Sequence, residues 1–245
     1  GYERIMTPSI EHYDTIQHAL GEQLRSECIM FFDSSGSRLV LRPDHTTPIA
    51  RIVSSRLQHE CPQKLFYADP VFRKDAILGE TEIFQFGCEH IGDLSIQDEA
   101  KSMADAISLC QKVGCEDVEI HMAHSELFDD ASELDKQCLA SGDWSSFASL
   151  PQKGGRELAK NSQYFQALFN ELDSLNIGDC VYINKGLYKD VTYYNGLYFD
   201  IVSPHFGKVI GSGGRYDSVI KAFNMTSHAF GFALRLHYVE RSICK

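Results

Sequence analysis

Apolar residues recur at spacings of three and four along several stretches of the chain, and this spacing predicts amphipathic helices. The clearest stretch begins at a capping box formed by Ser95 and Asp98 and ends at Gly114. Another begins near Pro48, which suits a first helical turn. Helical spacing is also found before Arg25 and over most of residues 124–178.

Other stretches have alternating or continuous apolar residues, which predict strands. The predicted strands are 64–73, 83–91, 118–122, 181–183, 191–202, 208–211 and the start of 230–240. A turn cluster at 33–36 predicts a hairpin within 31–41. Strands in hairpin-like succession with helices between some of them favour an α+β fold, an antiparallel sheet flanked by helices, over a regular βαβ series.

The strand 83–91 carries the most informative polar pattern. Alternation places Phe84 and Cys88 on one face, expected to be core, and Gln85, Gly87 and Glu89 on the other. The amide of Gln85, the space left above Gly87 and the carboxylate of Glu89 would together form a suitable surface beneath a small polar ligand. A half-exposed antiparallel strand explains the same alternation, so both interpretations remain open.

Three further segments are candidates for the same pocket. Tyr194 precedes a strand in which Tyr198 alternates with apolar residues, and Asp44 lies between a predicted strand and a predicted helix. An N-capping role explains Asp44 equally well. The segment 213–217 begins with two glycines, which permit either close approach to a ligand or a tight turn.

The composition is that of a soluble globular protein, with 43% hydrophobic and 23% charged residues. Its net charge of −11 argues against a nucleic-acid partner, and no apolar run is long enough to predict a membrane span. The eight cysteines form no C-x-x-C pair, so we expect reduced thiols, a cytoplasmic location and no metal site. No motif predicts a cofactor or a nucleophile with its base.

An ordered set of motifs resembles the catalytic domain of histidyl-tRNA synthetases over essentially the whole chain. The motifs are Thr7-Pro8, Leu41-Arg42-Pro43-Asp44-x-Thr46, Phe72-Arg73, Phe84 to Glu89, Tyr193 to Asp200, Gly213-Gly214-Arg215-Tyr216-Asp217 and Gly231 to Leu234. The resemblance implies a single class II synthetase-like domain over 1–245 with a helical insertion at about 124–178. It also implies dimerisation near Pro8. We expect residues to be missing before Gly1 and no anticodon-binding domain after Glu240.

The resemblance places histidine contacts at six positions of this chain: Asp44, Thr46, Arg73, Gln85, Glu89 and Tyr194. Arginines that would hold ATP phosphates are replaced at Ala76, Thr81, Lys189 and Tyr238, and Glu80 and Glu82 add negative charge. Such a site is unsuited to a triphosphate, so adenylation is not expected.

These departures, with the continuation Thr47-Pro48-Ile49-Ala50-Arg51, are similar to the regulatory subunits of ATP phosphoribosyltransferase. That resemblance implies a non-catalytic subunit that assembles with the short-form catalytic subunit as a hetero-octamer. It implies feedback control by histidine in the first step of histidine biosynthesis. Two alternatives remain: a fragment of a histidyl-tRNA synthetase, and a stand-alone histidine sensor.

Overall fold

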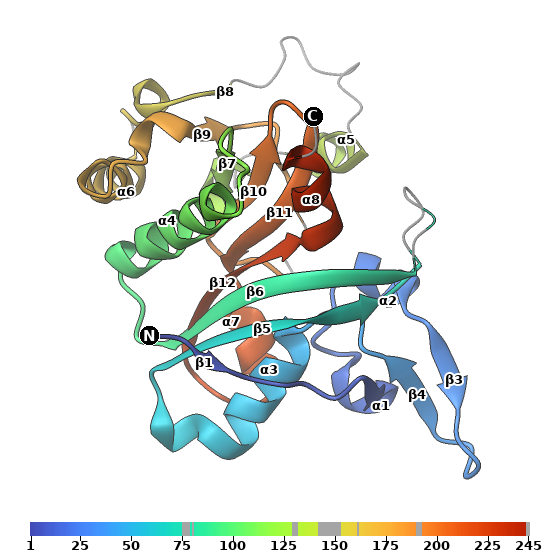
Figure 1. The fold of residues 1–245 in the computed structure, drawn as a ribbon. Helices are drawn as coiled ribbons and strands as arrows, with labels where there is room; N and C mark the ends of the chain where they lie inside the picture. Colours follow the sequence, from blue (N-terminus) through green and yellow to red (C-terminus); the bar gives the residue numbers. More distant parts are fainter. Residues whose placement is uncertain are drawn as a thin grey trace.

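The computed structural model describes residues 1–74, 79, 81–128, 132–141, 153–160, 162–189 and 193–243. In these parts of the chain the architecture is a large, mostly antiparallel sheet with helices on both faces, beside a small second sheet (Figure 1). The expected α+β class is therefore confirmed.

The large sheet has the strand order β1-β5-β6-β12-β11-β10-β7-β9-β8. Its strands are β1 (Glu3–Arg4), β5 (Gln63–Phe72), β6 (Glu82–Gly92), β7 (Glu119–His124), β8 (Lys153–Gly154), β9 (Val181–Asn184), β10 (Leu197–Ser203), β11 (Lys208–Arg215) and β12 (His228–Arg235). The small sheet contains β2 (Ile10–His12), β4 (Arg38–Leu41) and β3 (Met30–Phe32), in that order.

The α-helices are α1 (Tyr13–Ile16), α2 (Glu22–Glu27), α3 (Thr46–Ile52), α4 (Ile96–Lys112), α5 (Glu133–Ser141), α6 (Gln163–Ser174), α7 (Asp217–Ala222) and α8 (Leu236–Ile243). Short helical turns are η1 (Val53–Leu57), η2 (Gln58–Glu60), η3 (Ser125–Phe128), η4 (Arg156–Ala159) and η5 (Gly178–Cys180). None of the helices in the described part of the chain has the length and apolar character needed to cross a membrane.

Two separate cores cover the two faces of the large sheet. Helices α4, α6 and α8 pack on one face, where Phe199, Phe232 and Met103 are buried. Helices α3 and α7 pack on the other face, around Tyr67 and Ile91. The face beneath α3 and α7 is also the face that carries Glu89, because Ile91 is two residues further along β6.

Most of the predicted elements are confirmed, including the helix from Ser95, whose capping box is formed by both reciprocal hydrogen bonds. The continuous helix expected before Arg25 is wrong, because the chain forms β2 and then two short helices interrupted at 17–21. The strand expected to begin near residue 191 begins at Leu197.

The expected burial pattern of β6 is also partly wrong. Phe84, expected in the core, is 45% exposed, whereas Gln85 and Glu89 on the polar face are buried. This strand lies in the interior of the sheet, and helices cover the polar face as well. Alternation therefore identified correctly which residues share a face. The prediction of burial is wrong at Phe84, which is exposed although its face was expected to be core.

The described parts of the segment 124–178 contain η3, α5, η4 and α6, together with the end of β7, the two residues of β8 and connecting turns. Its helix α6 packs against α4, and Phe165 and Leu168 belong to the main core of that face. The division of the chain into a domain and an insertion stays a prediction.

Candidate functional site

Small residues line the centre of the sheet face beneath α3 and α7. Strand pairing places three positions in one row, Gly87, Ala233 and Ser212, and three in the next, Glu89, Gly231 and Gly214. All but Glu89 are small, so side chains from neighbouring elements can reach over this face.

The Glu89 side chain extends over its cross-strand neighbour Gly231, where a Cβ atom would overlap its carboxylate. One carboxylate oxygen accepts a hydrogen bond from the Thr46 hydroxyl at 2.7 Å and the other from the Tyr216 hydroxyl at 2.7 Å. Glu89 is only 2% exposed. Burial raises its pKa to about 7, although both hydroxyls favour the ionised form.

Asp44 is the second buried carboxylate of the site. It accepts hydrogen bonds from the backbone N–H of Thr47 at 3.3 Å and from the Thr47 hydroxyl at 2.9 Å. The hydroxyl of Tyr193 lies 3.5 Å from its Oδ2. Asp44 therefore accepts hydrogen bonds from the first turn of α3, whose N-cap residue is His45 and not Asp44 as the capping interpretation expected. Burial raises its pKa to about 6, against the opposing effect of Arg73.

These two carboxylates bracket Thr46, and Asp44 contributes to the raised pKa of Glu89. Two buried carboxylates near each other are stabilised in the ionised form when a cation lies beside them. An ammonium group of a ligand is such a cation. The arrangement therefore favours a small ligand that carries an amine.

The structure brings Asp44, Thr46 and Glu89 together and places the other predicted residues around them. Arg73 lies close enough to Asp44 to lower its pKa. Gln85 is buried on the same face of β6 as Glu89, four residues along the strand.

Tyr194 lies before β10, beside the side chain of Ser212. The Lys189 ammonium lies 5.4 Å from the centroid of the Tyr194 ring and pairs with Asp200 at 2.5 Å. Burial acts to lower the pKa of Lys189, but Asp200 and Tyr194 outweigh it and the pKa is raised. This end of the site therefore holds a permanently charged ammonium that is already neutralised by a carboxylate.

The expected open space over Gly87 is not present. A Cβ atom at Gly87 would collide with the phenol of Tyr67 from the neighbouring strand β5, so that ring occupies the space. The ring of His45 stacks on the Tyr67 ring, with 4.1 Å between the two centroids. The glycine thus accommodates an aromatic side chain of the protein.

Sequence reasoning missed three residues of this site: Tyr67, Tyr193 and Tyr216. Each has a pKa raised well above its ordinary value by burial, so each hydroxyl remains a hydrogen-bond donor. Tyr193 and Tyr216 belong to the motifs that resemble the synthetases. Their partners Asp44 and Glu89 are far away in sequence, so no local pattern pointed to these contacts.

The segment 213–217 both contacts Glu89 and forms ion pairs that support the fold. While Tyr216 donates to Glu89, the preceding Arg215 forms an ion pair with Glu99 at 3.2 Å. Glu99 is 1% exposed and accepts a hydrogen bond from the Tyr164 hydroxyl of α6. Arg215 also pairs with Asp217 at 3.3 Å, so it joins a buried and a partly exposed carboxylate.

Two of the predicted differences from the synthetases lie outside the described residues: Ala76 and Glu80. Among the described positions, Tyr238 is 4% exposed and packs in the core, 5.5 Å from the ring of Phe206. The backbone oxygen of Thr81 accepts a hydrogen bond from the backbone N–H of Arg73.

The sequence profile of the histidyl-tRNA synthetase family matches residues 1–137 and 137–239. An ATP phosphoribosyltransferase regulatory subunit from Carboxydothermus hydrogenoformans is 30% identical over 287 residues, covering 99% of this chain and 87% of the relative. A Bacillus subtilis protein of the same description is 28% identical over 96% of this chain and 71% of its own length.

Solved structures agree with these sequence relationships. The crystal structure of an ATP phosphoribosyltransferase regulatory subunit/histidyl-tRNA synthetase from Bacillus halodurans has a TM-score of 0.84 at 26% identity, over 100% of this chain and 75% of that chain. Histidyl-tRNA synthetase from S. aureus shares the fold, with a TM-score of 0.72 at 20% identity over 98% of this chain and 60% of that chain. Together with the site geometry, these matches show that the chain belongs to the histidyl-tRNA synthetase family and, within it, to the ATP phosphoribosyltransferase regulatory subunits.

Proposed function

We propose that this chain is the non-catalytic partner of a short-form ATP phosphoribosyltransferase catalytic subunit and binds histidine as the feedback effector. One observation carries the effector proposal: Asp44 and Glu89 are buried together with raised pKa values and flank Thr46. The ammonium of histidine would pair with these carboxylates. The imidazole would lie toward Tyr194 and its polar neighbours.

The direct test is the mass of the complex formed with a short-form catalytic subunit, measured by light scattering with and without histidine. We expect a hetero-octamer whose phosphoribosyltransferase activity falls when histidine is added. If the chain binds histidine but forms no complex with the catalytic subunit, the result would support a stand-alone sensor instead. The free thiols of the seven cysteines in the described residues suit assembly in the cytoplasm.

We expect no histidine-dependent exchange of pyrophosphate into ATP. The ammonium of Lys189 is already paired with Asp200, and Tyr238 is buried in the core, so neither position offers a free guanidinium to phosphates. Stabilisation of a transferring phosphoryl group requires several aligned donors, so Tyr238→Arg alone should not restore exchange. Radiolabelled pyrophosphate incorporation measures this, with an active histidyl-tRNA synthetase as positive control. Incorporation above the no-enzyme blank would contradict the non-catalytic proposal.

Self-association is expected through the small sheet near Pro8. Strand pairing places Ile10, Leu41, Leu39 and Phe31 on one face together with the exposed His12, and of the apolar residues Ile10 is 49% and Phe31 36% exposed. The opposite face packs against α1 through buried Val40. An apolar face of this kind suits a second copy of the chain.

A charge on this face should weaken the dimer. For Ile10→Lys we expect the dimer dissociation constant to rise by about 10- to 100-fold, because the lysine replaces a large apolar contact. Sedimentation equilibrium measures it. Phe32→Lys is the matched control, because Phe32 is 70% exposed and pairs with Arg38, outside the apolar face. Equal weakening by both substitutions would place the interface elsewhere.

A further inference from the structure

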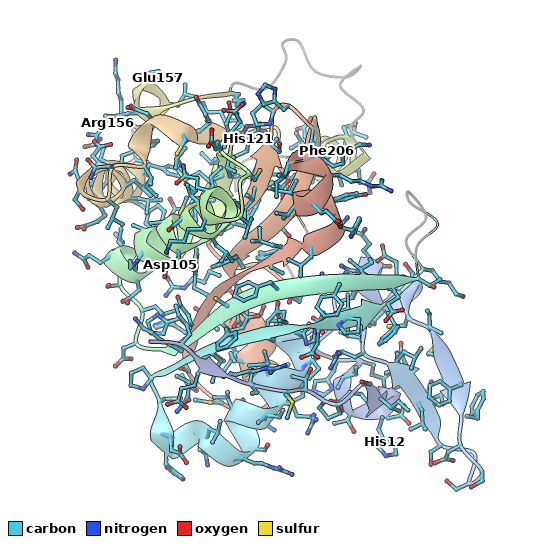
Figure 2. The ribbon with its side chains drawn as sticks, in the orientation of Figure 1. His12, Asp105, His121, Arg156, Glu157 and Phe206 are labelled. Carbon is cyan, nitrogen blue, oxygen red and sulfur yellow. The ribbon has the colours of Figure 1, made fainter. Side chains whose placement is uncertain are left out.

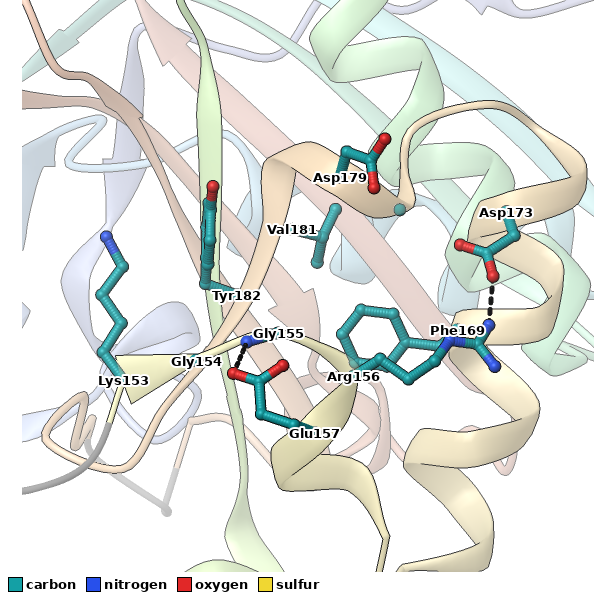
Figure 3. Close-up of a pocket in the computed structure, with 11 residues that line it drawn as sticks. Lys153, Gly154, Gly155, Arg156, Glu157, Phe169, Asp173, Asp179, Val181 and Tyr182 are labelled. Carbon is teal, nitrogen blue, oxygen red and sulfur yellow. Dashed lines mark hydrogen bonds and ion pairs between the residues drawn. The ribbon is translucent and has the colours of Figure 1, made fainter.

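The two ends of the molecule differ in what their side chains contact. At one end, where Arg156 projects (Figure 2), a cavity of about 520 Å³ has its apolar wall covered by the chain itself, because the Arg156 guanidinium lies 5.7 Å from the centroid of the Phe169 ring (Figure 3). At the other end, near His12, the segment that leads into the small sheet reaches the turn that carries Asp44 and Thr46. This contact joins the expected dimer interface to the proposed histidine site.

The segment that leads into β2 is exposed on one side and buried at Thr7. Met6 is 74% and Ile10 49% exposed, whereas Thr7 is only 8% exposed. Arg42 holds the segment in place. Its Nη1 donates to the backbone oxygen of Thr7 at 2.6 Å and to the Thr7 hydroxyl at 2.9 Å, and its backbone N–H donates to the backbone oxygen of Ser9 at 2.9 Å. The segment therefore carries exposed apolar side chains and one buried hydroxyl.

The buried hydroxyl of Thr7 lies 3.0 Å from Nδ1 of His45, which is 1% exposed. The other ring nitrogen, Nε2, lies 3.0 Å from the backbone oxygen of Asp69. A carbonyl oxygen only accepts, so Nε2 carries the proton, and Nδ1 accepts from the Thr7 hydroxyl. Burial, with the charge of Arg42, lowers the pKa of His45 to about 4, so the ring stays neutral at neutral pH. The hydrogen bonds therefore run in one direction, from Arg42 through Thr7 and His45 to Asp69.

His45 stands between Asp44 and Thr46 in the chain and is the N-cap residue of α3. Its ring is fixed by both nitrogens and by the stack on Tyr67. Side chains that bind a ligand keep their positions when the residues behind them are held in this way. The contact with Thr7 therefore supports the turn that presents Asp44 and holds Thr46 against Glu89.

We propose that His45 is the positioning residue through which self-association strengthens histidine binding. This rests on the proposed function, which supplies both the histidine site and the dimer face. A second copy of the chain that covers Met6 and Ile10 holds their segment in its docked arrangement, where the Thr7 hydroxyl bonds to His45.

When the segment leaves, Nδ1 of His45 becomes a buried acceptor without its donor, and the turn 44–46 loses that support. The second copy and histidine both favour the docked arrangement. Each therefore tightens the binding of the other, and the two factors are equal.

The test compares four forms of the chain: wild type, Ile10→Lys, Thr7→Val and the double variant. Histidine affinity is measured by calorimetry at a concentration where sedimentation equilibrium shows a wild-type dimer and an Ile10→Lys monomer. Each single substitution should raise the dissociation constant of histidine roughly 3- to 10-fold, the value of one positioning hydrogen bond. The double variant should bind no more weakly than the weaker single variant, because both substitutions remove the same support.

Two further variants separate positioning from general damage to the segment. Thr7→Ser keeps the hydroxyl and should bind histidine as the wild type does. Ser9→Ala is the matched control, because Ser9 is exposed in the same segment and contributes its backbone oxygen, which alanine keeps. Circular-dichroism melts check that each variant folds.

Independent, multiplicative effects in the double variant would overturn the proposal, as would unchanged affinity in either single variant or an Ile10→Lys chain that stays dimeric. If Thr7→Val does not fold, the wild type decides: saturating histidine should lower its dimer dissociation constant by a similar factor, and an unchanged constant overturns the coupling. A wild type that binds no histidine would overturn the proposed function as well. Wild-type binding without these effects would overturn the coupling alone.

Discussion

Glu89→Gln is expected to weaken histidine binding by about 10- to 150-fold at pH 8, equivalent to roughly 1.5–3 kcal/mol for a partly desolvated ammonium contact. The substitution keeps the shape of the side chain and removes the charge. The amide oxygen can still accept from one of the two hydroxyls of Thr46 and Tyr216, and the other hydroxyl must turn to accept from the amide NH2. Calorimetric titration of both forms measures the loss. Unchanged affinity would remove Glu89 from the effector site.

The same carboxylate makes histidine binding dependent on pH. Because the pKa of Glu89 is raised to about 7, part of the population is protonated near neutrality. An ammonium beside it favours the ionised form, so binding at pH 6.5 should release protons. Titrations in two buffers with different ionisation enthalpies measure this release, and Glu89→Gln should reduce it.

The Glu89 carboxyl is expected to contribute a loss of stability to the unliganded protein as the pH rises from about 4.5 to 7, whereas His45, whose pKa burial lowers to about 4, contributes a gain over part of the same range. In the folded state the pKa of Glu89 is about 7, against 4.5 for the ordinary group, so the folded protein binds more protons throughout this interval. The contribution of Glu89 to the unfolding free energy therefore falls with rising pH and levels off above about 7. For Glu89 alone this amounts to on the order of 3 kcal/mol. Asp44 adds a fall of the same sign below about pH 6.

Glu89→Gln should remove most of that slope, because glutamine mimics the protonated form. At pH 8 we expect the unliganded variant to melt roughly 5–10 °C above the wild type, with little difference at pH 4.5. Thermal melts across this range measure the effect, and Glu22→Gln on the exposed surface of α2 should leave the slope unchanged. A variant that melts lower than the wild type at pH 8 would mean that the Glu89 charge stabilises the fold, contrary to its raised pKa.

Local signals in the sequence were sufficient for much of the fold. The capping box at Ser95, the turn at 33–36 and the alternation in β6 each involve neighbouring residues, and each specifies its element. The failure before Arg25 has a physical cause. Ile16 and Leu20 are buried at helical spacing, but Gly21 lies between them and the next helix, and the chain bends there to pack on the small sheet.

The site was predictable only as a set of residues. Alternation placed Glu89, Gly87 and Gln85 on one face, but the occupant of the space over Gly87 is Tyr67 from the adjacent strand. No spacing rule within β6 identifies a side chain that arrives from β5. The raised pKa values of Asp44 and Glu89 likewise depend on burial beneath α3 and α7, which is a property of the tertiary structure.

The contact between Tyr164 and Glu99 limits how freely segments can be exchanged among relatives of this chain. Glu99 belongs to α4, but Tyr164, one of its two partners, comes from α6 in the segment 124–178. A transplanted segment without a hydroxyl at this position would leave a buried carboxylate with Arg215 alone, and Arg215 adjoins Tyr216, which donates a hydrogen bond to Glu89. A chimaera that keeps the length and helical pattern of this segment would therefore still be incompatible unless it also keeps that tyrosine.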